Sequence, residues 1–367
     1  MGKTHGRCWV DINFAAIRSN LEYARACAPD SQLLFAVKAD AYGHGIVPVA
    51  QMAESHVDWL GVATVTEAET LREAGITCPV LKLSGSMPDR VDAVIEADVS
   101  LTVTDEDTIE QAQEAAEYLG RQAQVHLKVD TGMGRVGCPP EKAVCLARRI
   151  DDQPNLSLQG VFTHLPVSDS DTEYTDGQIE SFRNVVADVE AARGEVEYVH
   201  WANSGAILAG QADGSNLVRV GIMGYGYDPS GSAHPELTPA MDWMARVSFL
   251  KHVRAGTMVS YGHTWTSERD TWIATVAAGY GDGYLRANSN RGRVTIKGES
   301  YPVVGRVCMD QLLVDLGQKT PSVVPGDPVV LLSKNGPSAD EVAAACDTIS
   351  YEILCSVLPR VRRNYRG

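Results

Sequence analysis

The feature that most constrains the fold is a regular alternation of short apolar runs and longer amphipathic segments between about residues 30 and 225. Eight apolar runs have the length of buried strands: Leu33–Val37, Trp59–Ala63, Val80–Ser84, Ser100–Val103, Gln124–Val129, Gln159–Thr163, Tyr198–Ala202 and Leu217–Val220. Helical patterns lie between most of them: Val65–Ala74, Pro88–Ala97, Asp105–Tyr118, Pro140–Ile150 and Tyr174–Ala192. Eight strand–helix units are the number that closes a TIM-type (β/α)8 barrel. A doubly wound sheet fits less well, because no Gly-rich first turn is visible.

After Pro229 the pattern changes to strands separated by glycine turns. The expected strands are Met241–Arg254, Trp272–Ala278, Arg293–Lys297, Tyr301–Val307, Leu312–Leu316 and Pro328–Ser333, with two short helices, Ala339–Cys346 and Tyr351–Leu358. The fold class is therefore α/β, a barrel over residues 10–233 followed by a mostly β C-terminal domain over residues 234–367. Trp9–Asp11 is a candidate additional strand, so residues 1–9 are expected to join the C-terminal domain.

Bulk properties exclude several kinds of partner. The 367-residue chain carries a net charge of −15, which disfavours nucleic-acid binding, since that needs clustered Lys and Arg. The eight cysteines include no CxxC pair, so neither a zinc site nor a small disulfide framework is expected, and no metal is predicted. The sequence shows no signal peptide and no apolar stretch long enough to span a membrane, which favours a cytoplasmic protein without a membrane partner.

Polar side chains recur where the expected barrel strands end. In a barrel the carboxyl ends of all strands meet on one face, and that face carries the active site. The residues at these ends are Lys38 after the first strand, Lys128 and Asp130 at the fifth, His164 at the sixth, Asn203 and Ser204 at the seventh, and Arg219 to Gly221 at the eighth. The barrel interpretation therefore predicts one site built from five strands.

Lys38 and the loop after the eighth strand suggest a cofactor. The loop Arg219–Gly226 is rich in glycine, and loops after strands seven and eight of a barrel often hold a phosphate with backbone N–H groups. A phosphate site and a lysine on one barrel mouth indicate pyridoxal phosphate, joined to Lys38 through an imine bond. Taken alone, Lys38 is better explained as a solvated lysine after a strand, and the glycines are equally compatible with a tight turn.

The segment Ala36–Gly45, AVKADAYGHG, resembles the cofactor-lysine motif of alanine racemases, which are fold-type III pyridoxal-phosphate enzymes. The resemblance covers nearly the whole chain. It recurs at Val125–Gly137 (VHLKVDTGMGRVG), Asn203–Gly205, Val218–Gly221, Ser260–Gly262, Gly279–Gly283 (GYGDG) and Cys308–Gln311 (CMDQ). Several such motifs in order are highly specific.

The resemblance implies a two-base mechanism. Lys38 would hold the cofactor and act as one base, and Tyr261 would be the base on the opposite face of Cα, supplied by the partner subunit of a homodimer. Both groups ordinarily have pKa values near 10, so neighbouring positive charge must lower them. The substrate would be alanine, and the product D-alanine would serve peptidoglycan precursors.

The resemblance assigns further roles around the cofactor. Arg219 would meet the pyridine nitrogen, and since an arginine cannot accept a proton, that nitrogen would stay unprotonated. His164 would lie behind Arg219. Lys128 would be carbamylated and hold Arg135, which with the backbone N–H of Met309 would face the substrate carboxylate.

The remaining implied residues form a phosphate shell and an entrance. The cofactor-binding set is Lys38, Tyr42, His164, Asn203, Ser204, Arg219, Gly221, Ile222 and Tyr351. Tyr280 and Tyr351 would narrow the entrance to leave room for a methyl side chain. Asp169, Arg286 and Arg306 would form its outer part, although an ordinary surface charge network explains these three equally well.

Other functions remain open at this point. One is a racemase for serine or for several small amino acids, which kinetic comparison of L-alanine with L-serine would separate. Another is a single-barrel pyridoxal-phosphate carrier without enzymatic activity, which the β domain bearing Tyr261 and Met309 argues against. A decarboxylase of the same fold is the last, and it would not be expected to carry SYG and CMDQ at these positions.

Overall fold

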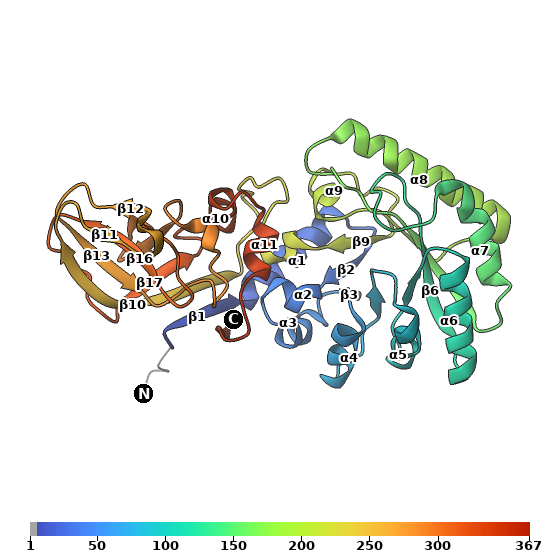
Figure 1. The fold of residues 1–367 in the computed structure, drawn as a ribbon. Coiled ribbons are helices and arrows are strands. Elements are labelled where there is room, and N and C mark those ends of the chain that lie inside the picture. The colour runs from blue at the N-terminus through green and yellow to red at the C-terminus, as the bar shows by residue number, and fades with distance from the viewer. Residues whose placement is uncertain (1–5) are drawn as a thin grey trace.

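The computed structural model describes residues 6–367 as two parts that lie end to end (Figure 1). One part is a barrel of parallel strands surrounded by helices, and the other is a mostly β domain. The predicted fold class, a (β/α)8 barrel followed by a mostly β domain, is confirmed. No helix in the described range is both long and apolar enough to cross a membrane.

The barrel is built from two parallel four-stranded halves. Their strand orders are β4-β3-β2-β9 and β5-β6-β7-β8. The strands are β2 (Gln32–Ala36), β3 (Trp59–Val62), β4 (Val80–Lys82), β5 (Leu101–Val103), β6 (Ala123–Lys128), β7 (Leu156–Phe162), β8 (Tyr198–His200) and β9 (Leu217–Val220). A parallel bridge between Leu81 and Ser100 joins the halves on one side. On the other side the backbone N–H of Arg219 donates to the carbonyl of Ala202 at 2.9 Å, so the barrel is closed.

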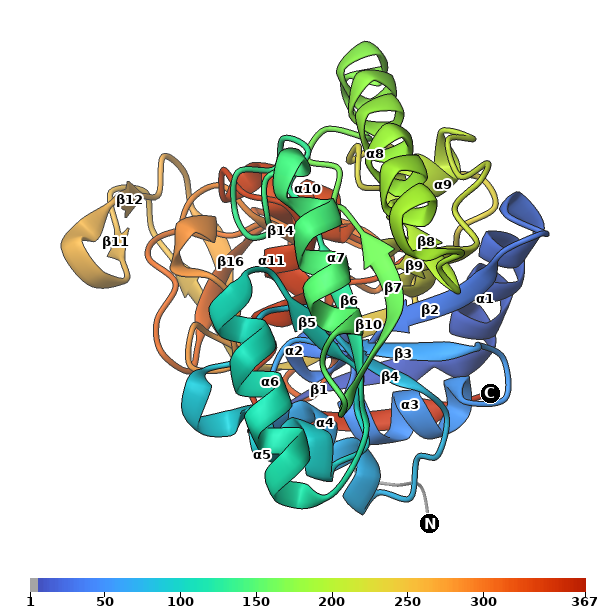
Figure 2. The ribbon, with the colours of Figure 1, turned by 90° about the vertical axis from the view of Figure 1, so that its right-hand side faces the viewer.

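Helices surround this barrel, as Figure 2 shows. They are α1 (Phe14–Cys27), α3 (Ile46–Ala53), α4 (Val65–Glu73), α5 (Val91–Glu96), α6 (Glu106–Leu119), α7 (Ala143–Asp151), α8 (Thr172–Arg193) and α9 (Ser204–Leu208). Short 3₁₀ turns η1 (Pro88–Arg90) and η2 (Pro140–Lys142) precede α5 and α7, as the first-turn prolines predict. The expected cap of α6 is confirmed, because the Asp105 carboxylate accepts from the N–H of Thr108 at 2.8 Å.

Helix α1 fills a place that the sequence pattern left empty. The last barrel strand, β9, is followed only by the 3₁₀ turn η3 (Ile222–Tyr225). Helix α1, which comes before the first barrel strand in the sequence, packs on that turn. The buried Asn20 amide donates to the carbonyls of Gly224 at 3.2 Å and Thr238 at 2.9 Å. The eighth strand is thus covered by a helix that precedes the first.

The β domain is organised around the long strand β10 (Met241–Val253). The main sheet has the order β15-β14-β17-β10-β1-β18, and β13 pairs with β10 and β16. Its other strands are β1 (Cys8–Asn13), β13 (Thr271–Val276), β14 (Arg293–Ile296), β15 (Glu299–Pro302), β16 (Leu312–Gly317), β17 (Pro328–Leu332) and β18 (Arg362–Arg366). β15 ends before the predicted boundary, because the chain turns at Gly305 with a left-handed φ of 72°.

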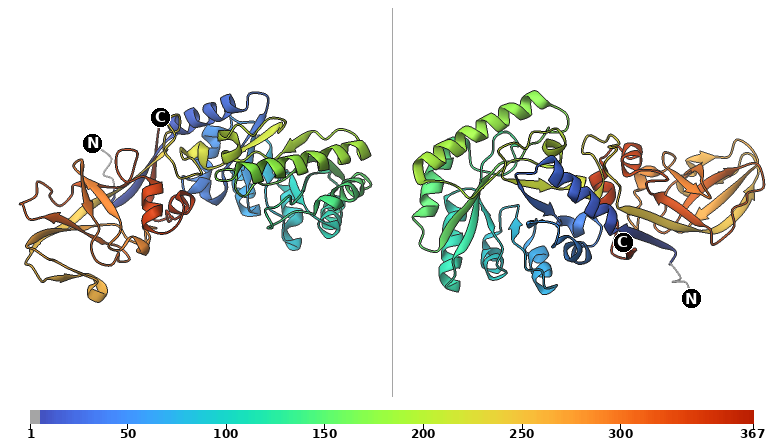
Figure 3. Two further views of the ribbon diagram at one scale, coloured as in Figure 1. Left: turned by 90° about the horizontal axis from the view of Figure 1, so that it is seen from above. Right: turned by 180° about the vertical axis from the view of Figure 1, so that it is seen from behind.

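Both ends of the described chain lie in this sheet. β1 pairs antiparallel with β10 and parallel with β18, which confirms the additional strand expected near Trp9. Residues 1–5, the rest of the segment expected to join this domain, lie outside the described residues. Two helices, α10 (Ala339–Ala345) and α11 (Ser350–Cys355), bring the chain back to the barrel before β18, and both views in Figure 3 place the C-terminus beside the junction of the two parts.

Candidate active site

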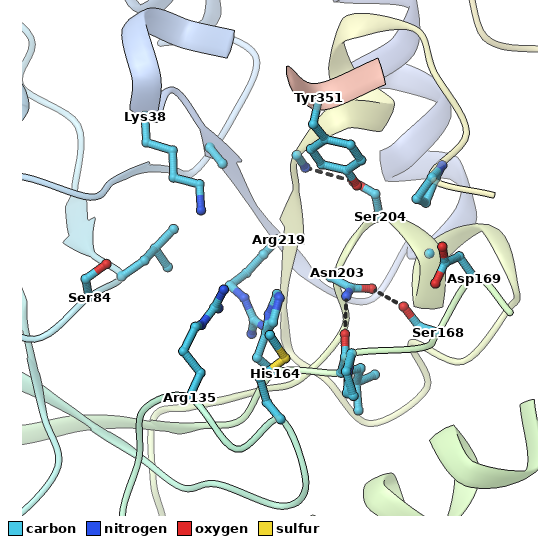
Figure 4. Close-up of a pocket in the computed structure, with 18 of the residues that line it drawn as sticks. Lys38, Ser84, Arg135, His164, Ser168, Asp169, Asn203, Ser204, Arg219 and Tyr351 are labelled. Carbon is cyan, nitrogen blue, oxygen red and sulfur yellow. Dashed lines mark hydrogen bonds between the residues drawn. The ribbon is translucent and has the colours of Figure 1, made fainter. Parts of the chain in front are cut away.

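A cavity of about 680 Å³ opens where the barrel strands end. Eleven of the residues singled out from the sequence line it: Lys38, Tyr42, Lys128, Arg135, His164, Asp169, Asn203, Ser204, Arg219, Gly221 and Tyr351. Ile222 is buried directly after Gly221 in the chain. In the close-up of Figure 4 the side chain of Lys38 points toward the space above Arg135 and Arg219, with Tyr351 and Ser204 on the other side.

Lys38 follows β2 by one residue and reaches into the cavity. Its pKa is lowered from the ordinary value, first by burial and then by the positive charges of Arg135 and Arg219. Glu67 acts in the opposite direction. A larger fraction of this amine is therefore neutral at physiological pH than for a solvated lysine, which is the form that acts as a nucleophile or a base.

The backbone immediately after Lys38 forms a left-handed turn. Ala39, Asp40, Ala41 and Tyr42 all have φ between 52° and 54°, although none is glycine. This conformation costs about 1–2 kcal/mol for each such residue. The short element α2 (Lys38–Tyr42) is thus not an ordinary α-helix. Its strained backbone persists because contacts from other elements hold it, and such strain is typical of ligand sites.

A group of hydrogen-bond donors lies beside the loop after β9. The Ser204 hydroxyl accepts from the backbone N–H of Gly221 at 2.9 Å, and the Tyr42 hydroxyl lies close by. A Cβ on Gly221 would come within 2.9 Å of that hydroxyl, so glycine keeps this corner open. The two hydroxyls fit the oxygens of a phosphate group, and the N–H of Gly221 positions the Ser204 hydroxyl for this role.

Asn203 shapes this corner from behind. Its side-chain oxygen caps α9 by accepting from the N–H of Ala206 at 3.1 Å, and it accepts from the Ser168 hydroxyl at 2.7 Å. Its amide donates to the carbonyl of Leu165 at 3.0 Å. Asn203 therefore fixes the start of the helix that carries Ser204, and it connects this helix to the loop after β7 (Figure 4).

Arg219 is buried at the base of the cavity and makes four hydrogen bonds. It donates to the carbonyls of Thr163 at 2.8 Å and Trp201 at 3.0 Å. It also contacts the Nδ1 atoms of His200 at 3.0 Å and His164 at 3.3 Å. Burial lowers the pKa of Arg219 to about 9, so the guanidinium remains charged at neutral pH. It presents a fixed cation that cannot accept a proton.

The contacts of Arg219 fix the tautomers of two buried histidines. A guanidinium only donates, so Nδ1 of His200 is an acceptor and its Nε2–H points to Nδ1 of His126, 3.0 Å away. His126 then donates from Nε2 to Gln159 at 3.3 Å. Burial lowers the pKa of His126 to about 4 and holds that of His200 well below its ordinary value, in agreement with neutral rings. This polar chain through the barrel orients Arg219.

Lys128 lies at the end of β6, with its Nζ 5.0 Å from the centre of the Phe162 ring. Burial lowers its pKa to about 7, and the charges of Arg219, Arg135 and Lys38 add to this effect. Much more of this lysine is therefore neutral near pH 7 than of a solvated lysine. A neutral amine beside two arginines is a nucleophile whose conversion to an anion would be favoured electrostatically.

Five residues predicted for the site do not reach this cavity. Tyr261, Met309, Tyr280, Arg286 and Arg306 belong to the β domain, and none of them lines the cavity formed by the described residues. The side chain of Tyr261 is 72% exposed, and those of Met309 and Tyr280 are 54% and 40% exposed. Tyr261 lies on η4 (Tyr261–His263), next to the small hairpin of β11 (Met258–Val259) and β12 (Trp265–Thr266). Within one chain the site is built from the barrel face and from α11, whose Tyr351 and Cys355 line the cavity.

Sequence reasoning missed several residues that the structure brings to the site. His200 and His126 orient Arg219, and their signal was a histidine within each of two short buried strands. Cys355 lines the cavity beside Lys38, and nothing in the sequence distinguished it from the other cysteines. Among the described residues no group of His, Cys, Asp and Glu is arranged to hold a metal ion.

Comparison with known proteins covers both parts of the chain. Residues 12–229 match the family description "Alanine racemase, N-terminal domain", and residues 240–365 match "Alanine racemase, C-terminal domain". A curated alanine racemase from Cutibacterium acnes is 47% identical over 97% of each chain. A second, from Chlorobaculum tepidum, is 42% identical over 96% of this chain and 94% of the relative.

Solved structures agree with these matches. Alanine racemase from Streptomyces lavendulae superposes with a TM-score of 0.92 at 36% identity, covering 100% of this chain and 98% of the other. The enzyme from Bartonella henselae, solved with covalently bound pyridoxal phosphate, gives a TM-score of 0.89 at 26% identity and covers 98% and 100% of the two chains.

Proposed function

Since the chain belongs to the alanine racemase family and is an isomerase that interconverts L-alanine and D-alanine, we propose that Lys38 and Tyr261 are its two bases. The observation that carries this proposal is Lys38, a lysine with a lowered pKa that reaches into the cavity at the barrel mouth. Racemisation needs a proton to leave one face of Cα and another to arrive on the opposite face. A single base fixed in the barrel serves only one of them.

The barrel cavity fits pyridoxal phosphate by its donor set. Ser204, Tyr42 and the backbone of Gly221 and Ile222 would hold the phosphate, with Tyr351 at its rim. Arg219 would donate to the ring nitrogen, held in place by His164 and the other contacts described above. Lys38 would attach the cofactor covalently. When bound, pyridoxal phosphate withdraws electrons from Cα and so makes its proton acidic.

Lys38 would move the proton on the barrel side of Cα. Burial and then the neighbouring cations lower its pKa, which favours the neutral amine that can accept a proton. Arg135, which is exposed at the cavity rim, would meet the substrate carboxylate. Arg135 would thus both lower the pKa of Lys38 and bind the substrate.

We propose that Tyr261 of the partner subunit serves the other face. Its side chain is largely exposed on its own chain, as are Met309 and Tyr280, and an exposed group of this kind gains a function when a second chain covers it. In a homodimer Met309 would offer its backbone N–H to the carboxylate, and Tyr280 would limit the side-chain pocket to a methyl group. Arg286 and Arg306 of the partner, with Asp169, would form the outer entrance.

Lys128 would be carbamylated. Its neutral amine attacks CO2 and loses a proton, which leaves an N-linked carboxylate on the side chain and releases H⁺. The lowered pKa of about 7 supports this step, because the amine must be neutral to react. The resulting anion would hold Arg135 in place of the repulsion between two cations. Mass measurement of the intact protein in the presence of bicarbonate tests the modification.

We further propose that the D-alanine formed supplies peptidoglycan precursors in the cytoplasm. The absorption spectrum before and after borohydride, combined with a D-alanine assay, tests the core of the proposal. Borohydride should abolish the absorbance of the cofactor-linked lysine and fix the cofactor to the peptide that contains Lys38. An unchanged spectrum, or a label on another peptide, would contradict the assignment.

A further inference from the structure

Two arginines near the C-terminus contact two regions that the proposed mechanism assigns to different active sites. Arg360 and Arg363 lie in the segment 356–363, which we call the C-terminal bracket. The bracket directly follows α11, whose Tyr351 and Cys355 line the cavity of the same chain. It runs into the final strand, β18, whose first two residues are Arg362 and Arg363.

Arg363 holds the left-handed turn that follows Lys38. Its side chain is only 12% exposed. It donates from Nε to the carbonyl of Gly43 at 2.9 Å and pairs with the Asp40 carboxylate at 3.0 Å. It also donates to the carbonyl of Val357 at 3.1 Å, which ties the turn to the bracket. A backbone turn that is unfavourable by itself depends on such outside contacts.

Arg360 holds the loops that carry Tyr280 and Met309. It pairs through Nε with Asp282 at 2.9 Å and through Nη2 with Asp310 at 2.8 Å. The same Nη2 donates to the carbonyl of Met309 at 3.3 Å. The guanidinium therefore connects one loop to the other.

The two loops are also bonded to each other through their backbones. Asp282 is buried, and its second oxygen accepts from the N–H of Gly279 at 3.0 Å. The N–H of Gly281 donates to the carbonyl of Met309 at 2.8 Å, and the N–H of Tyr280 donates to the carbonyl of Cys308 at 3.0 Å. Met309 and Tyr280 thus form one hydrogen-bonded unit with Asp282.

The bracket packs on this unit with its own backbone. The N–H of Leu358 donates to the carbonyl of Asp282 at 3.1 Å, and the Ser356 hydroxyl donates to the carbonyl of Gly283 at 2.9 Å. A Cβ on Gly283 would lie 1.9 Å from the carbonyl oxygen of Ser356, so the loop sits directly against the bracket. Gly283 has a φ of 108°, which only glycine adopts readily.

We propose that Arg363 is a positioning residue for Lys38 in the site of its own chain, whereas Arg360 is a positioning residue for Met309 and Tyr280 in the site of the partner subunit. This inference rests on the proposed function, in which the β domain serves the other chain. The bracket then sets the geometry on both sides of the substrate, but in two different sites. Loss of Arg363 should therefore lower activity in the site of the chain that carries the change. Loss of Arg360 should lower it in the site of the partner subunit.

Hybrid dimers test this assignment. One subunit carries Lys38→Ala and the other carries Tyr261→Phe, with a different affinity tag on each, so that a purified hybrid has one complete site. That site uses Lys38 of the Tyr261→Phe chain and the loops of the Lys38→Ala chain. Arg360→Ala on the Lys38→Ala chain should lower kcat/KM of the hybrid by up to about 100-fold, because small misplacements at a reacting centre have effects of this size.

The same change on the other chain is the matched control. Arg360→Ala on the Tyr261→Phe chain should leave kcat/KM within about twofold, since its loops serve the site without Lys38. Arg363→Ala should show the opposite dependence, lowering activity only on the Tyr261→Phe chain. Arg360→Ala should mainly raise KM for alanine, and Arg363→Ala should mainly lower kcat and shift the cofactor absorbance.

Equal losses from both placements would overturn the inference, because they would indicate a general loss of stability. No restored activity in the hybrid without an arginine change would instead contradict the shared site of the proposed function. Where Arg360→Ala chains do not fold, Arg360→Lys replaces them, because it keeps the charge toward Asp282 and loses the fork that also reaches Met309. Its effect should depend on placement in the same way, and equal losses would again overturn the inference.

Discussion

The barrel mouth and the exposed β-domain loops that carry Tyr261 and Met309 differ in how completely one chain forms them. At the barrel mouth Arg219 is buried, Ser204 and Gly221 are bonded to each other, and Lys38 has a shifted pKa. In the β-domain loops Tyr261 is 72% exposed and Met309 is 54% exposed. A buried polar site is organised before any ligand arrives, whereas an exposed one gains its environment only on assembly. In the proposed mechanism, the barrel residues of the active site are therefore organised within one chain, whereas Tyr261 and Met309 gain their surroundings only in the dimer.

The largest effect is expected from the barrel side. Lys38→Ala removes both the covalent link to the cofactor and one base, so racemisation should fall by about 10³-fold or more, since a general base alone contributes roughly 10²–10⁴-fold. D-alanine formation from L-alanine measures this. Lys38→Arg is the control for charge, and it should be inactive as well. More than a few per cent of the parent activity in either variant would remove Lys38 from the mechanism.

A change at Tyr261 should lower activity without lowering stability. Tyr261→Phe should slow racemisation by about 10²-fold. The free energy of unfolding should change by less than about 0.5 kcal/mol, because the residue is exposed. An isotope effect with Cα-deuterated alanine should increase in the direction that starts from L-alanine. Tyr118→Phe, on another exposed tyrosine, should change neither quantity. Equal isotope effects in both directions would contradict the assignment of Tyr261 to one face.

A smaller effect is expected at Gly221, beside the proposed phosphate position in the barrel mouth. Gly221→Ala places a methyl group within 2.9 Å of the Tyr42 hydroxyl. Overpacking of this kind costs about 1–3 kcal/mol, so the Kd for pyridoxal phosphate should rise by roughly 5- to 150-fold. Absorbance titration of the cofactor-free protein measures it. Gly177→Ala, on α8 with no atom near the added carbon, should leave the Kd unchanged. An unchanged Kd for Gly221→Ala would mean that the phosphate lies elsewhere.

The smallest expected effect is the pH dependence of stability. His44 and His126 are fully buried in the barrel, and burial lowers the pKa of each to about 4. The unfolded chain takes up their protons below about pH 6.5 and the folded chain does not, so stability falls as the pH drops from about 6.5 to 4. Each histidine contributes at most about 1.4 kcal/mol per pH unit in this range.

Urea unfolding at pH 7 and pH 5.5 measures this slope. His44→Asn should make the slope shallower by the contribution of one histidine, while Tyr261→Phe should leave it as it is. A slope that is the same in His44→Asn and in the parent would show that the buried ring takes up its proton in the folded state too.

Much of the barrel follows from the sequence, because its strands are continuous apolar runs that end on polar residues. Lys38, His164, Ser204 and Arg219 were predicted to share one mouth, and the structure brings them to one cavity. Closure of a parallel barrel leaves little freedom in where the strand ends meet. The assignment of their roles remains a prediction.

The features missed by sequence reasoning depend on contacts between distant segments. Helix α1 packs on η3 and so occupies the position of an eighth helix. No local sequence pattern predicts this packing. The hydrogen bond between His200 and His126 joins two strands 74 residues apart. The left-handed turn after Lys38 runs against local preference, because residues such as Ala39 and Tyr42 do not favour that conformation. Such a turn is visible only in three dimensions.

The distance along the chain between this turn and its support has a consequence for biosynthesis. Gly43 is held by Arg363, which lies 320 residues later, and β18, which contains Arg363, pairs with β1. During translation Lys38 emerges from the ribosome long before Arg363, so its turn lacks that support until Arg363 has been made. The turn that follows Lys38 is therefore among the later parts of the barrel mouth to be stabilised during synthesis.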